Sequence, residues 1–328
     1  MNTIADTEVK HHDTLEVLDS TKIKTYMACP RKFFFSYVLG WNPQNTSHDL
    51  VFGASVHSCL ESIYRDWMKE GKGYRDEQLL KGLSRFVQTY REEFPPETDS
   101  EVGPKNPNSF ARLLMLYADT YAHDNFEVLY TEIAGSICVG TSAEGKQRDM
   151  YMVLDTVCRD QKGEFILEHK TSKWGTYLWS KSFEQSIQVG VGNHVLHCLY
   201  DKPYGMVING LLFRAKEPEF KRLPIPMSPL QMEDWLVTVN SYFDMIYRDL
   251  DKLTESTDKE AVLKCFPKNE TACLQFNRVC PYADVCQGCA NPLRNVNPPI
   301  GFKQEYWDPR VREKREGVLM FSGEKPVE

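Results

Sequence analysis

The stretch MVLDTVCRDQKGEFILEHK, residues 152–170, decides the fold class of this chain. The segments 151–159 and 164–170 are rich in apolar and β-branched residues, which is typical of strands. Between them, Lys162 and Gly163 favour a turn. The stretch therefore predicts two consecutive strands joined by a tight connection.

Three charged residues lie within this predicted hairpin. Asp155 follows an apolar run in the first strand, whereas Glu168 and Lys170 are two residues apart in the second. Because alternate side chains of a strand share a face, Glu168 and Lys170 point the same way, and burying either one unpaired would be costly. A salt-bridged strand end at the protein surface would also produce this pattern, and such pairs contribute little energy.

The same three residues suit the hydrolysis of a phosphodiester bond. This reaction needs a hard cation held by oxygen ligands, because the cation polarises the phosphate and lowers the pKa of a bound water. The carboxylates of Asp155 and Glu168, on adjacent strands, would hold such a cation. The Lys170 ammonium would orient the water and stabilise the charge that develops on the phosphate. The pattern thus indicates a metal-dependent nuclease centre.

Helix-type and strand-type segments follow one another in an order that predicts an α/β core wrapped by an N-terminal helical part. The segment 94–108 is rich in Pro, Glu and Asn and is expected to be a loop. We expect helices from Thr21 to the Cys29-Pro30 pair and at 49–70, 76–93, 109–123, 183–200 and 229–253, and strands at 128–139, 151–159, 164–170 and 206–213.

One domain with two accessory ends is expected from this order. Residues 1–20 form a flexible leader, 21–290 the domain, and 291–328 a polar tail. Within the domain we expect a mainly helical part at 21–125, an α/β catalytic core at 126–255 and a cysteine-cluster segment at 256–290.

Composition and charge limit the class of protein. With 328 residues, of which 41% are hydrophobic, the chain is long enough to bury a core. The net charge of -7 does not favour nucleic-acid binding, although a nuclease can gather basic side chains in one cleft. No apolar run of roughly eighteen residues is present, and residues 1–13 lack the order of a secretory signal. We therefore expect a cytoplasmic protein that does not bind membranes.

Asp155, a hairpin and the Glu168-His169-Lys170 triplet together resemble the signature of the PD-(D/E)XK nuclease superfamily, with Leu154 in place of the signature proline. The resemblance implies a restriction-endonuclease-like fold, in which helices flank a central mixed sheet. It also implies that Asp155 and Glu168 bind Mg²⁺ or Mn²⁺ and that Lys170 is the catalytic lysine. A further acid in the preceding strand, Glu132, is not assigned to the site.

Two other segments resemble the RecB-like branch of this superfamily. Gly53 and His57 form a G-x-x-x-H pattern and, at helical spacing, share a face. In that branch the histidine joins the metal ligands, and a catalytic glutamine follows the lysine strand. Gln188 fits this position, with Gly192 in place of the usual tyrosine, and Gln185 is the alternative.

Four of the ten cysteines, Cys273, Cys280, Cys286 and Cys289, cluster near the C-terminus. In a reducing compartment so dense a cluster indicates a metal site rather than a disulfide framework, and zinc bound by these cysteines alone is one interpretation. Together with the distant Cys29, the pattern resembles the iron-sulfur RecB-like nucleases, among them the AddB nuclease domain, CRISPR-associated relatives and phage exonucleases. The resemblance implies a 4Fe-4S cluster bound by Cys29, Cys273, Cys280 and Cys286, with Cys289 as the substitute.

The function implied by these resemblances is that of a DNA nuclease, in the first place an exonuclease, acting on DNA ends or single strands in recombination, repair or processing. The chain lacks the G-x-x-x-x-G-K-[ST] pattern, so it would act alone or with a helicase or recombination partner, and its size fits a phage-encoded enzyme. The aromatic and basic run 31–41 is expected to fill the core, and the alternative is that its aromatic side chains line a path for DNA. Two other interpretations stay open: a catalytically silent DNA-binding or assembly subunit with the same fold, and an unrelated zinc-stabilised protein.

Overall fold

The computed structural model describes residues 12–71, 73–173, 175, 177–214, 217–275, 278–295, 297–314 and 318–321. The chain divides into two compact units. The domain limits expected from the sequence stay a prediction. Unit 1 contains Met1–Asn45, Cys138–Tyr151 and Glu233–Val311, and unit 2 contains Thr46–Ile137, Met152–Met232 and Arg312–Glu328.

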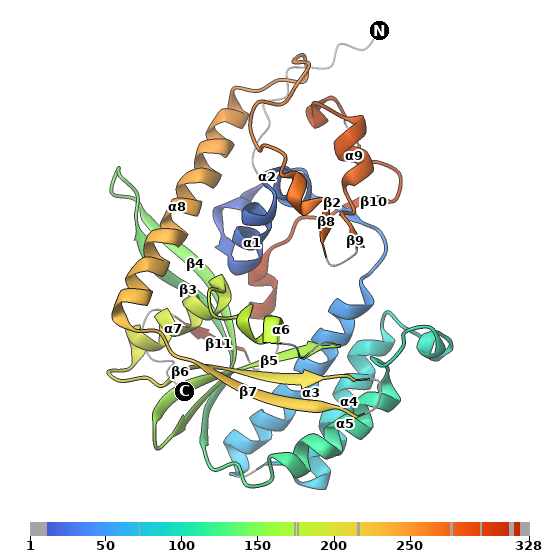
Figure 1. Ribbon diagram of the computed structural model, residues 1–328, viewed down its shortest axis with the longest axis vertical. Coiled ribbons are helices and arrows are strands. Elements are labelled where there is room, and N and C mark those ends of the chain that lie inside the picture. The colour runs from blue at the N-terminus through green and yellow to red at the C-terminus, as the bar shows by residue number, and fades with distance from the viewer. Residues whose placement is uncertain are drawn as a thin grey trace. The chain divides into compact units, whose positions relative to one another are not determined.

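A mixed sheet of seven strands has the order β11-β3-β4-β5-β6-β7, with β1 paired to β4 (Figure 1). β4 and β5 are antiparallel, as are β6 and β7, whereas β5 and β6 are parallel. The expected hairpin is therefore confirmed as β4 and β5. The strands are β1 Leu18–Asp19, β3 Glu127–Thr141, β4 Gln147–Asp160, β5 Gly163–Ser172, β6 Gly205–Leu212, β7 Glu219–Ile225 and β11 Leu319–Phe321.

Helices of unit 2 lie against both faces of this sheet. α3, α4 and α5 pack together and share one buried apolar cluster with the sheet residues Leu167, Val207 and Leu211 (Figure 1). α7 covers the opposite face and packs closely on it at Gly192, where a Cβ would lie 2.3 Å from the Met206 Cε atom, so that a larger residue would have to displace this side chain. The helices are α3 His48–Glu70, α4 Asp76–Arg91, α5 Pro107–Thr120, α6 Tyr177–Lys181 and α7 Ile187–Leu199.

The amphipathic pattern of α3 explains its position. Phe52, Val56, Leu60 and Ile63 recur at helical spacing and are fully buried, so they form one apolar stripe against the sheet. The helix ends at Gly71, whose φ of 85° favours glycine over other residues. Its range agrees with the helix expected at 49–70.

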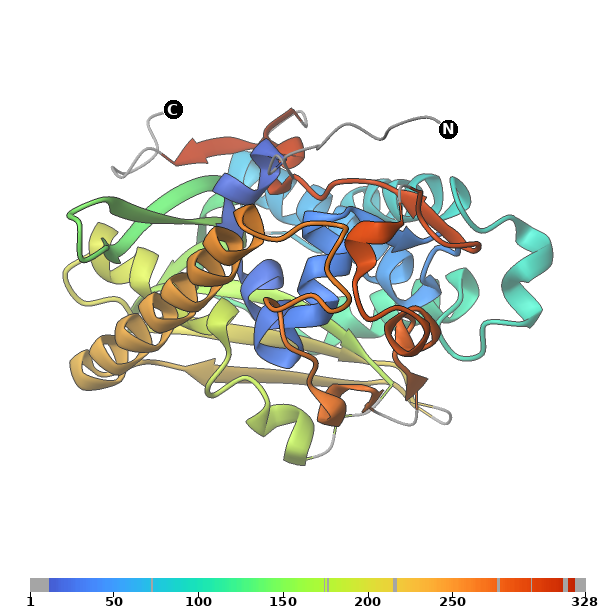
Figure 2. The same cartoon turned by 90° about the horizontal axis from the view of Figure 1, so that it is seen from above.

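Unit 1 contains helices, two small two-stranded sheets and the end of the large sheet where β3 turns into β4. α8 runs beside the β3–β4 turn region (Figure 2), where Asn240 Nδ2 donates to the Val139 carbonyl at 2.7 Å and Arg148 Nη1 donates to Asn240 Oδ1 at 3.1 Å. The helices are α1 Ser20–Ala28, α2 Pro30–Phe33, the π-helical turn η2 Phe34–Val38, α8 Pro229–Thr254 and α9 Ala283–Gly288, and the paired strands are β2 Trp41–Pro43 with β10 Phe302–Gln304 and β8 Leu274–Gln275 with β9 Arg278–Val279.

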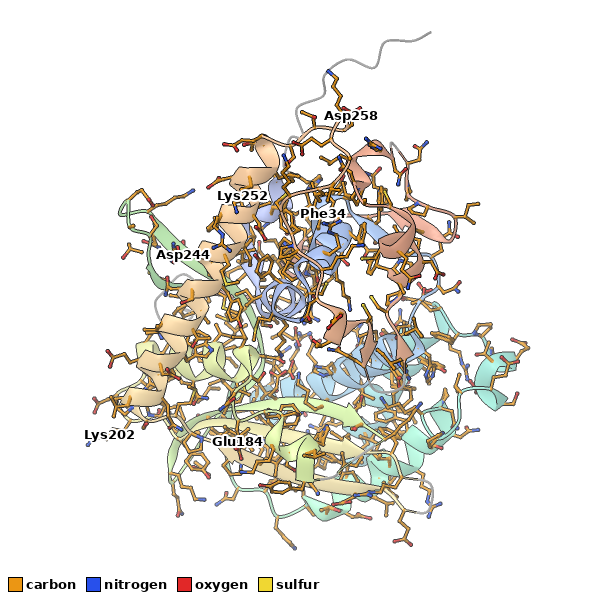
Figure 3. All side chains as sticks on the ribbon, turned by 45° about the horizontal axis from the view of Figure 1, so that its top comes forward. Phe34, Glu184, Lys202, Asp244, Lys252 and Asp258 are labelled. Atoms are coloured by element: carbon orange, nitrogen blue, oxygen red, sulfur yellow. The ribbon has the colours of Figure 1, made fainter. Side chains whose placement is uncertain are left out.

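The aromatic run 31–41 forms the core of unit 1. Phe33, Phe34 and Phe35 are fully buried, and Trp41 stacks on Phe35 with ring centroids 5.9 Å apart. Figure 3 shows Phe34 enclosed by other side chains, whereas Asp244 of α8 lies at the surface. The expectation that this run fills the core is confirmed.

Three segments differ from their expected structure. Within the expected leader, residues 13–19 form a 3₁₀ turn and strand β1, because Leu15 and Leu18 are buried. Within the expected polar tail, the described residues include β10 and β11. β7 was not expected, because its charged residues and Pro224 are unlike a central strand, but an edge strand tolerates both.

The helix expected at 183–200 begins later, as α7, and is preceded by the short helix α6. Among the described residues, the helices are all too short or too polar to span a lipid bilayer.

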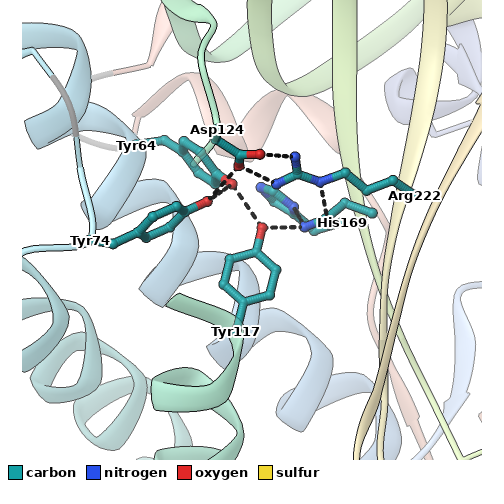
Figure 4. Close-up of polar contacts among 7 residues, drawn as sticks. Tyr64, Tyr74, Tyr117, Asp124, His169 and Arg222 are labelled. Carbon is teal, nitrogen blue, oxygen red and sulfur yellow. Dashed lines mark hydrogen bonds and ion pairs between the residues drawn. The ribbon is translucent and has the colours of Figure 1, made fainter. Parts of the chain in front are cut away.

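A buried polar network in unit 2 joins α3, α5, β5, β6 and β7 (Figure 4). The Tyr64 hydroxyl lies 2.8 Å from the hydroxyls of both Tyr74 and Tyr117. Asn209 Nδ2 donates to the Tyr117 hydroxyl at 2.8 Å and lies 2.9 Å from His169 Nδ1. Burial lowers the pKa of His169 to about 3, so its ring is neutral and Nδ1 accepts from Asn209. This requires the ring proton to be on Nε2.

Arg222 and Asp124 complete the network with a bidentate ion pair, in which both N···O distances are 2.7 Å. The guanidinium carbon also lies 3.7 Å from the centre of the Tyr121 ring. The two charged side chains are 21% and 12% exposed, so the pair is largely shielded from water.

We predict that Asp124→Ala lowers the free energy of unfolding by about 2–3 kcal/mol, because it leaves the Arg222 charge largely buried without its carboxylate. Urea denaturation monitored by circular dichroism measures this loss. The control is Arg159→Ala, which removes ion pairs at a side chain that is 46% exposed and should cost less than about 1 kcal/mol. Equal effects of the two substitutions would contradict the structural role of the network.

Candidate functional site

The register of the hairpin places two acids side by side. Thr156 of β4 pairs with Leu167 of β5, so the next residues along the two strands, Asp155 and Glu168, are neighbours. The side chains of β5 alternate as expected: Leu167 belongs to the apolar cluster beneath α3, whereas Glu168 contacts Gln188 of α7. The two acids thus meet in the middle of the sheet and not at a strand end on the surface.

Asp155 is 6% exposed and has a partner for each oxygen. His57 Nδ1 of α3 lies 3.1 Å from Oδ1, and the His169 backbone N–H donates to Oδ2 at 2.8 Å. Burial alone would raise the pKa of Asp155, but the charge and hydrogen bond of His57 outweigh it and hold that pKa well below its usual range. Conversely, burial would lower the pKa of His57, but Asp155 raises it. The pair is therefore an ion pair.

Glu168 is only 2% exposed and is unevenly satisfied. Its Oε1 accepts from Lys170 Nζ and from Gln188 Nε2, both at 2.6 Å, and Lys170 Nζ also donates to Gln188 Oε1 at 3.0 Å. Its Oε2 has no hydrogen-bond partner among the described residues. Burial and the negative charge of Asp155 raise the pKa of Glu168, against the opposing charge of Lys170.

The donors at this site fit a hard divalent cation. Two adjacent carboxylates supply oxygen ligands, and the buried Oε2 of Glu168, which no described residue contacts by a hydrogen bond, can accept a cation or a hydrogen-bond donor. In the described part of the chain, no three His, Cys, Asp or Glu side chains are arranged as a ready metal site. His57 and Lys170 instead balance the two acids, so a cation would bind by exchanging some of these contacts.

Glu132 of β3 is a further acid at this site that the sequence did not assign. It is buried, and its φ of 48° is unusual for a residue other than glycine. Burial, together with the negative charges of Asp155 and Glu61, raises its pKa to about 8. The sequence signal for this residue was an acid next to the apolar residues Ile133 and Ala134 of a predicted strand, because a charged side chain is seldom buried in such a strand without a role.

The structure separates the two candidate glutamines. Gln185 is exposed and precedes α7, whereas Gln188 lies in the first turn of α7 and contacts both Glu168 and Lys170. Gly192, one turn later, faces Met206 and Ile166, and a Cβ there would lie 2.3 Å from the Met206 Cε atom and 3.2 Å from the Ile166 Cδ1 atom. A tyrosine at this position would therefore require these two side chains to move.

The cysteines form a second candidate site, within unit 1. A cavity of about 570 Å³ is lined by Cys29, Cys273, Cys280 and Cys286 together with polar and apolar side chains. The sulfur of Cys289 instead accepts a hydrogen bond from Asn295 Nδ2 at 3.5 Å, and Cys289 does not line this cavity.

Hydrogen bonds hold the distant Cys29 next to the C-terminal cysteines. Asn269 Nδ2 donates to the Ala28 carbonyl at 2.7 Å, and the Arg31 backbone N–H donates to the Pro267 carbonyl at 3.2 Å. The Tyr282 hydroxyl lies 2.6 Å from Ser36 Oγ. Thiols are the ligands of iron-sulfur and structural zinc centres, so the chemical type of these donors fits either group. Among the described residues, no three of the cysteines are arranged as a ready metal site, so a bound centre would draw their sulfur atoms together.

Comparisons with known proteins bear on the first site. The sequence model of one family, the PD-(D/E)XK nuclease superfamily, matches residues 20–287. None of the curated proteins compared with the chain matches it. The crystal structure of SSO0001 is similar with 14% identity and a TM-score of 0.28, over 62% of this chain and 88% of that chain, which is too low to bear on the fold. The family match covers most of the chain, including Asp155, Glu168 and Lys170, and agrees with the mixed sheet flanked by helices. The chain belongs to the PD-(D/E)XK nuclease superfamily.

Proposed function

We propose that this protein is a metal-dependent deoxyribonuclease of the RecB-like branch, and in the first place an exonuclease, which hydrolyses phosphodiester bonds in DNA recombination, repair or processing. The observation that carries the proposal is the buried Glu168 carboxylate, whose Oε2 has no hydrogen-bond partner among the residues that the structure describes, while Asp155 and Lys170 lie beside it. Members of the superfamily generally use Mg²⁺ or Mn²⁺. In this proposal Asp155 and Glu168 hold such an ion.

When bound, the ion would polarise the phosphate and lower the pKa of a bound water. The residues of the chain prepare this chemistry. Burial would lower the pKa of Lys170, but Glu168 and Asp155 raise it, so the ammonium stays charged and can donate to a phosphate oxygen or the attacking water. Gln188 fixes the direction of that ammonium through its amide oxygen. His57 keeps Asp155 ionised, and it is the proposed third ligand once it has released a ring proton to solvent and given up this contact.

The aromatic side chains of the short helix α6 favour a single-stranded substrate or a DNA end over a duplex interior. Gly210 pairs with Lys170 across β5 and β6, and a Cβ at Gly210 would lie 2.5 Å from the Trp179 ring. Trp179 therefore covers the sheet next to the lysine, and Tyr177, on the same helix, is 73% exposed. Aromatic faces stack on unpaired bases, so we propose that the bases of one strand pass here. The enzyme would act alone or with a helicase or recombination partner.

The contacts of Asp155, Glu168 and Lys170 disfavour the alternative of a catalytically silent DNA-binding or assembly subunit. A subunit without activity would have no need to bury two adjacent acids at the cost of their desolvation and mutual repulsion. The interpretation as an unrelated zinc-stabilised protein is disfavoured by the family match.

We predict that Lys170→Met and Asp155→Asn each lower the rate of Mn²⁺-dependent cleavage of labelled linear DNA by at least about 10²-fold, because they remove charge that stabilises the transition state or holds the ion. Matched controls on the same hairpin are Lys162→Met and Asp160→Asn, outside the site, which should cleave at the parental rate. Cleavage by Lys170→Met at the parental rate would refute the mechanism.

The contacts of the two glutamines lead to a second prediction. Gln188→Ala should reduce cleavage by about 10- to 100-fold, because it frees the Lys170 ammonium and one oxygen of Glu168. Gln185→Ala, three residues away on the exposed turn, serves as the control and should keep the parental rate. The assay is single-turnover cleavage at saturating Mn²⁺. The opposite ranking of the two variants would assign the role to Gln185.

For the cysteine-lined cavity we propose a 4Fe-4S cluster bound by Cys29, Cys273, Cys280 and Cys286, with zinc as the alternative occupant. Support comes from the cavity, to which these four residues contribute and Cys289 does not. Such a centre would connect Cys29, which follows α1, to cysteines that precede α9 or lie within it, more than two hundred residues later in the chain. This connection would restrict the conformations of the unfolded state.

Anaerobic purification followed by visible absorption, iron and sulfide analysis tests this centre. We predict that Cys273→Ser and Cys286→Ser each lose most of the bound iron, because each removes one thiolate ligand. Cys289→Ser, in the same segment, should retain it. If the parent protein contains stoichiometric zinc and no iron, the occupant of the cavity is zinc and not a 4Fe-4S cluster. If only Cys289→Ser loses iron, Cys289 is a ligand in place of one of the four proposed cysteines.

A further inference from the structure

Arg31 is a buried cation at the edge of the cysteine-lined cavity. It belongs to α2, two residues after Cys29, and is only 3% exposed. Its Nε donates to the Phe266 carbonyl at 2.9 Å, and Nη2 lies 3.5 Å from the Leu263 carbonyl. Its Nη1 is shielded from solvent and has no hydrogen-bond partner in the described part of the chain. Arg31 therefore brings a largely uncompensated charge and one free donor to the cavity.

A buried guanidinium needs a negative group, because an unpaired charge in a protein interior is costly. Within the described residues, none of the salt bridges includes Arg31. Arg31 lines the same cavity as Cys29, Cys273, Cys280 and Cys286, and a cysteine carries negative charge only as the thiolate. The side chains around Arg31 thus become its counter-charge only when cysteines are ionised.

Cysteine binds metals as the thiolate. Four thiolates bring more negative charge than a divalent ion or an oxidised 4Fe-4S core offsets, so a centre in this cavity is a net anion. We propose that Arg31 is the internal counter-charge of this thiolate-bound centre and donates a hydrogen bond to it from Nη1. The inference rests on the proposed cysteine site and is independent of the nuclease centre.

Two lysines at the same cavity provide a comparison. Lys32 follows Arg31 on α2 and is partly exposed, and Lys268 donates to the Cys286 carbonyl through a largely exposed side chain. Water and salt screen an exposed charge, so these lysines should affect the centre much less than Arg31 does. Lys32 is therefore the matched control for the effect of burial.

The test uses the full chain, freed of metal under anaerobic conditions and titrated with Co²⁺ alone. Binding is followed by the near-ultraviolet absorption of thiolate-to-cobalt charge transfer, which does not depend on DNA cleavage. We expect Arg31→Gln, which removes the charge but keeps a donor, to weaken Co²⁺ binding by about tenfold or more. Arg31→Lys, which keeps the charge, should lose less, and Lys32→Gln should stay within about twofold of the parent.

Each outcome has a distinct meaning. Parental affinity in Arg31→Gln overturns the role of Arg31 while leaving the cysteine site intact. Absence of thiolate bands in the parent protein overturns the cysteine site and this inference together, but not the nuclease proposal. If metal-free Arg31→Gln fails to fold by circular dichroism, the comparison is made on Co²⁺-loaded protein by the rate of release to a chelator. Release about tenfold faster than from Lys32→Gln supports the proposal, and equal release refutes it.

Discussion

The burial of two adjacent carboxylates, Asp155 and Glu168, is the constraint on which the catalytic half of this structure depends. Each acid is nearly inaccessible to water, and their negative charges repel each other. The fold balances this cost with groups from three elements: the His57 ring from α3, the amide and lysine of β5, and the Gln188 amide from α7. Both faces of the sheet must therefore carry their helices before the acids can be buried.

The opposite face of β5 carries a second set of buried polar groups. His169 lies between the two site residues in sequence but faces the tyrosines of α3 and α5, where Asn209 and the Arg222–Asp124 pair complete the hydrogen bonds. Because its backbone N–H donates to Asp155, this residue connects the two sets. One strand thus positions the reactive groups with one face and is itself fixed by the other.

The cysteine site follows a different principle. Its residues come from segments far apart in the chain, and backbone and side-chain hydrogen bonds such as Asn269 to Ala28 bring them around one cavity. The buried aromatic run around Phe34 supplies the apolar support. Arg31 is the buried cation at this cavity, and its Nη1 atom has no hydrogen-bond partner among the described residues.

The hairpin, its acid-acid-lysine pattern and the range of α3 were determined by the sequence, because strand alternation and helical spacing are local properties. The tertiary structure decided what depends on distant partners. It placed Gln188 and not Gln185 beside Lys170, since Gln188 lies in the first turn of α7 against the sheet, whereas Gln185 precedes the helix and is exposed. It brought the unassigned Glu132 into the field of Asp155 and made the charged segment β7 an edge strand. Such outcomes follow from burial and charge balance between elements, which no local pattern contains.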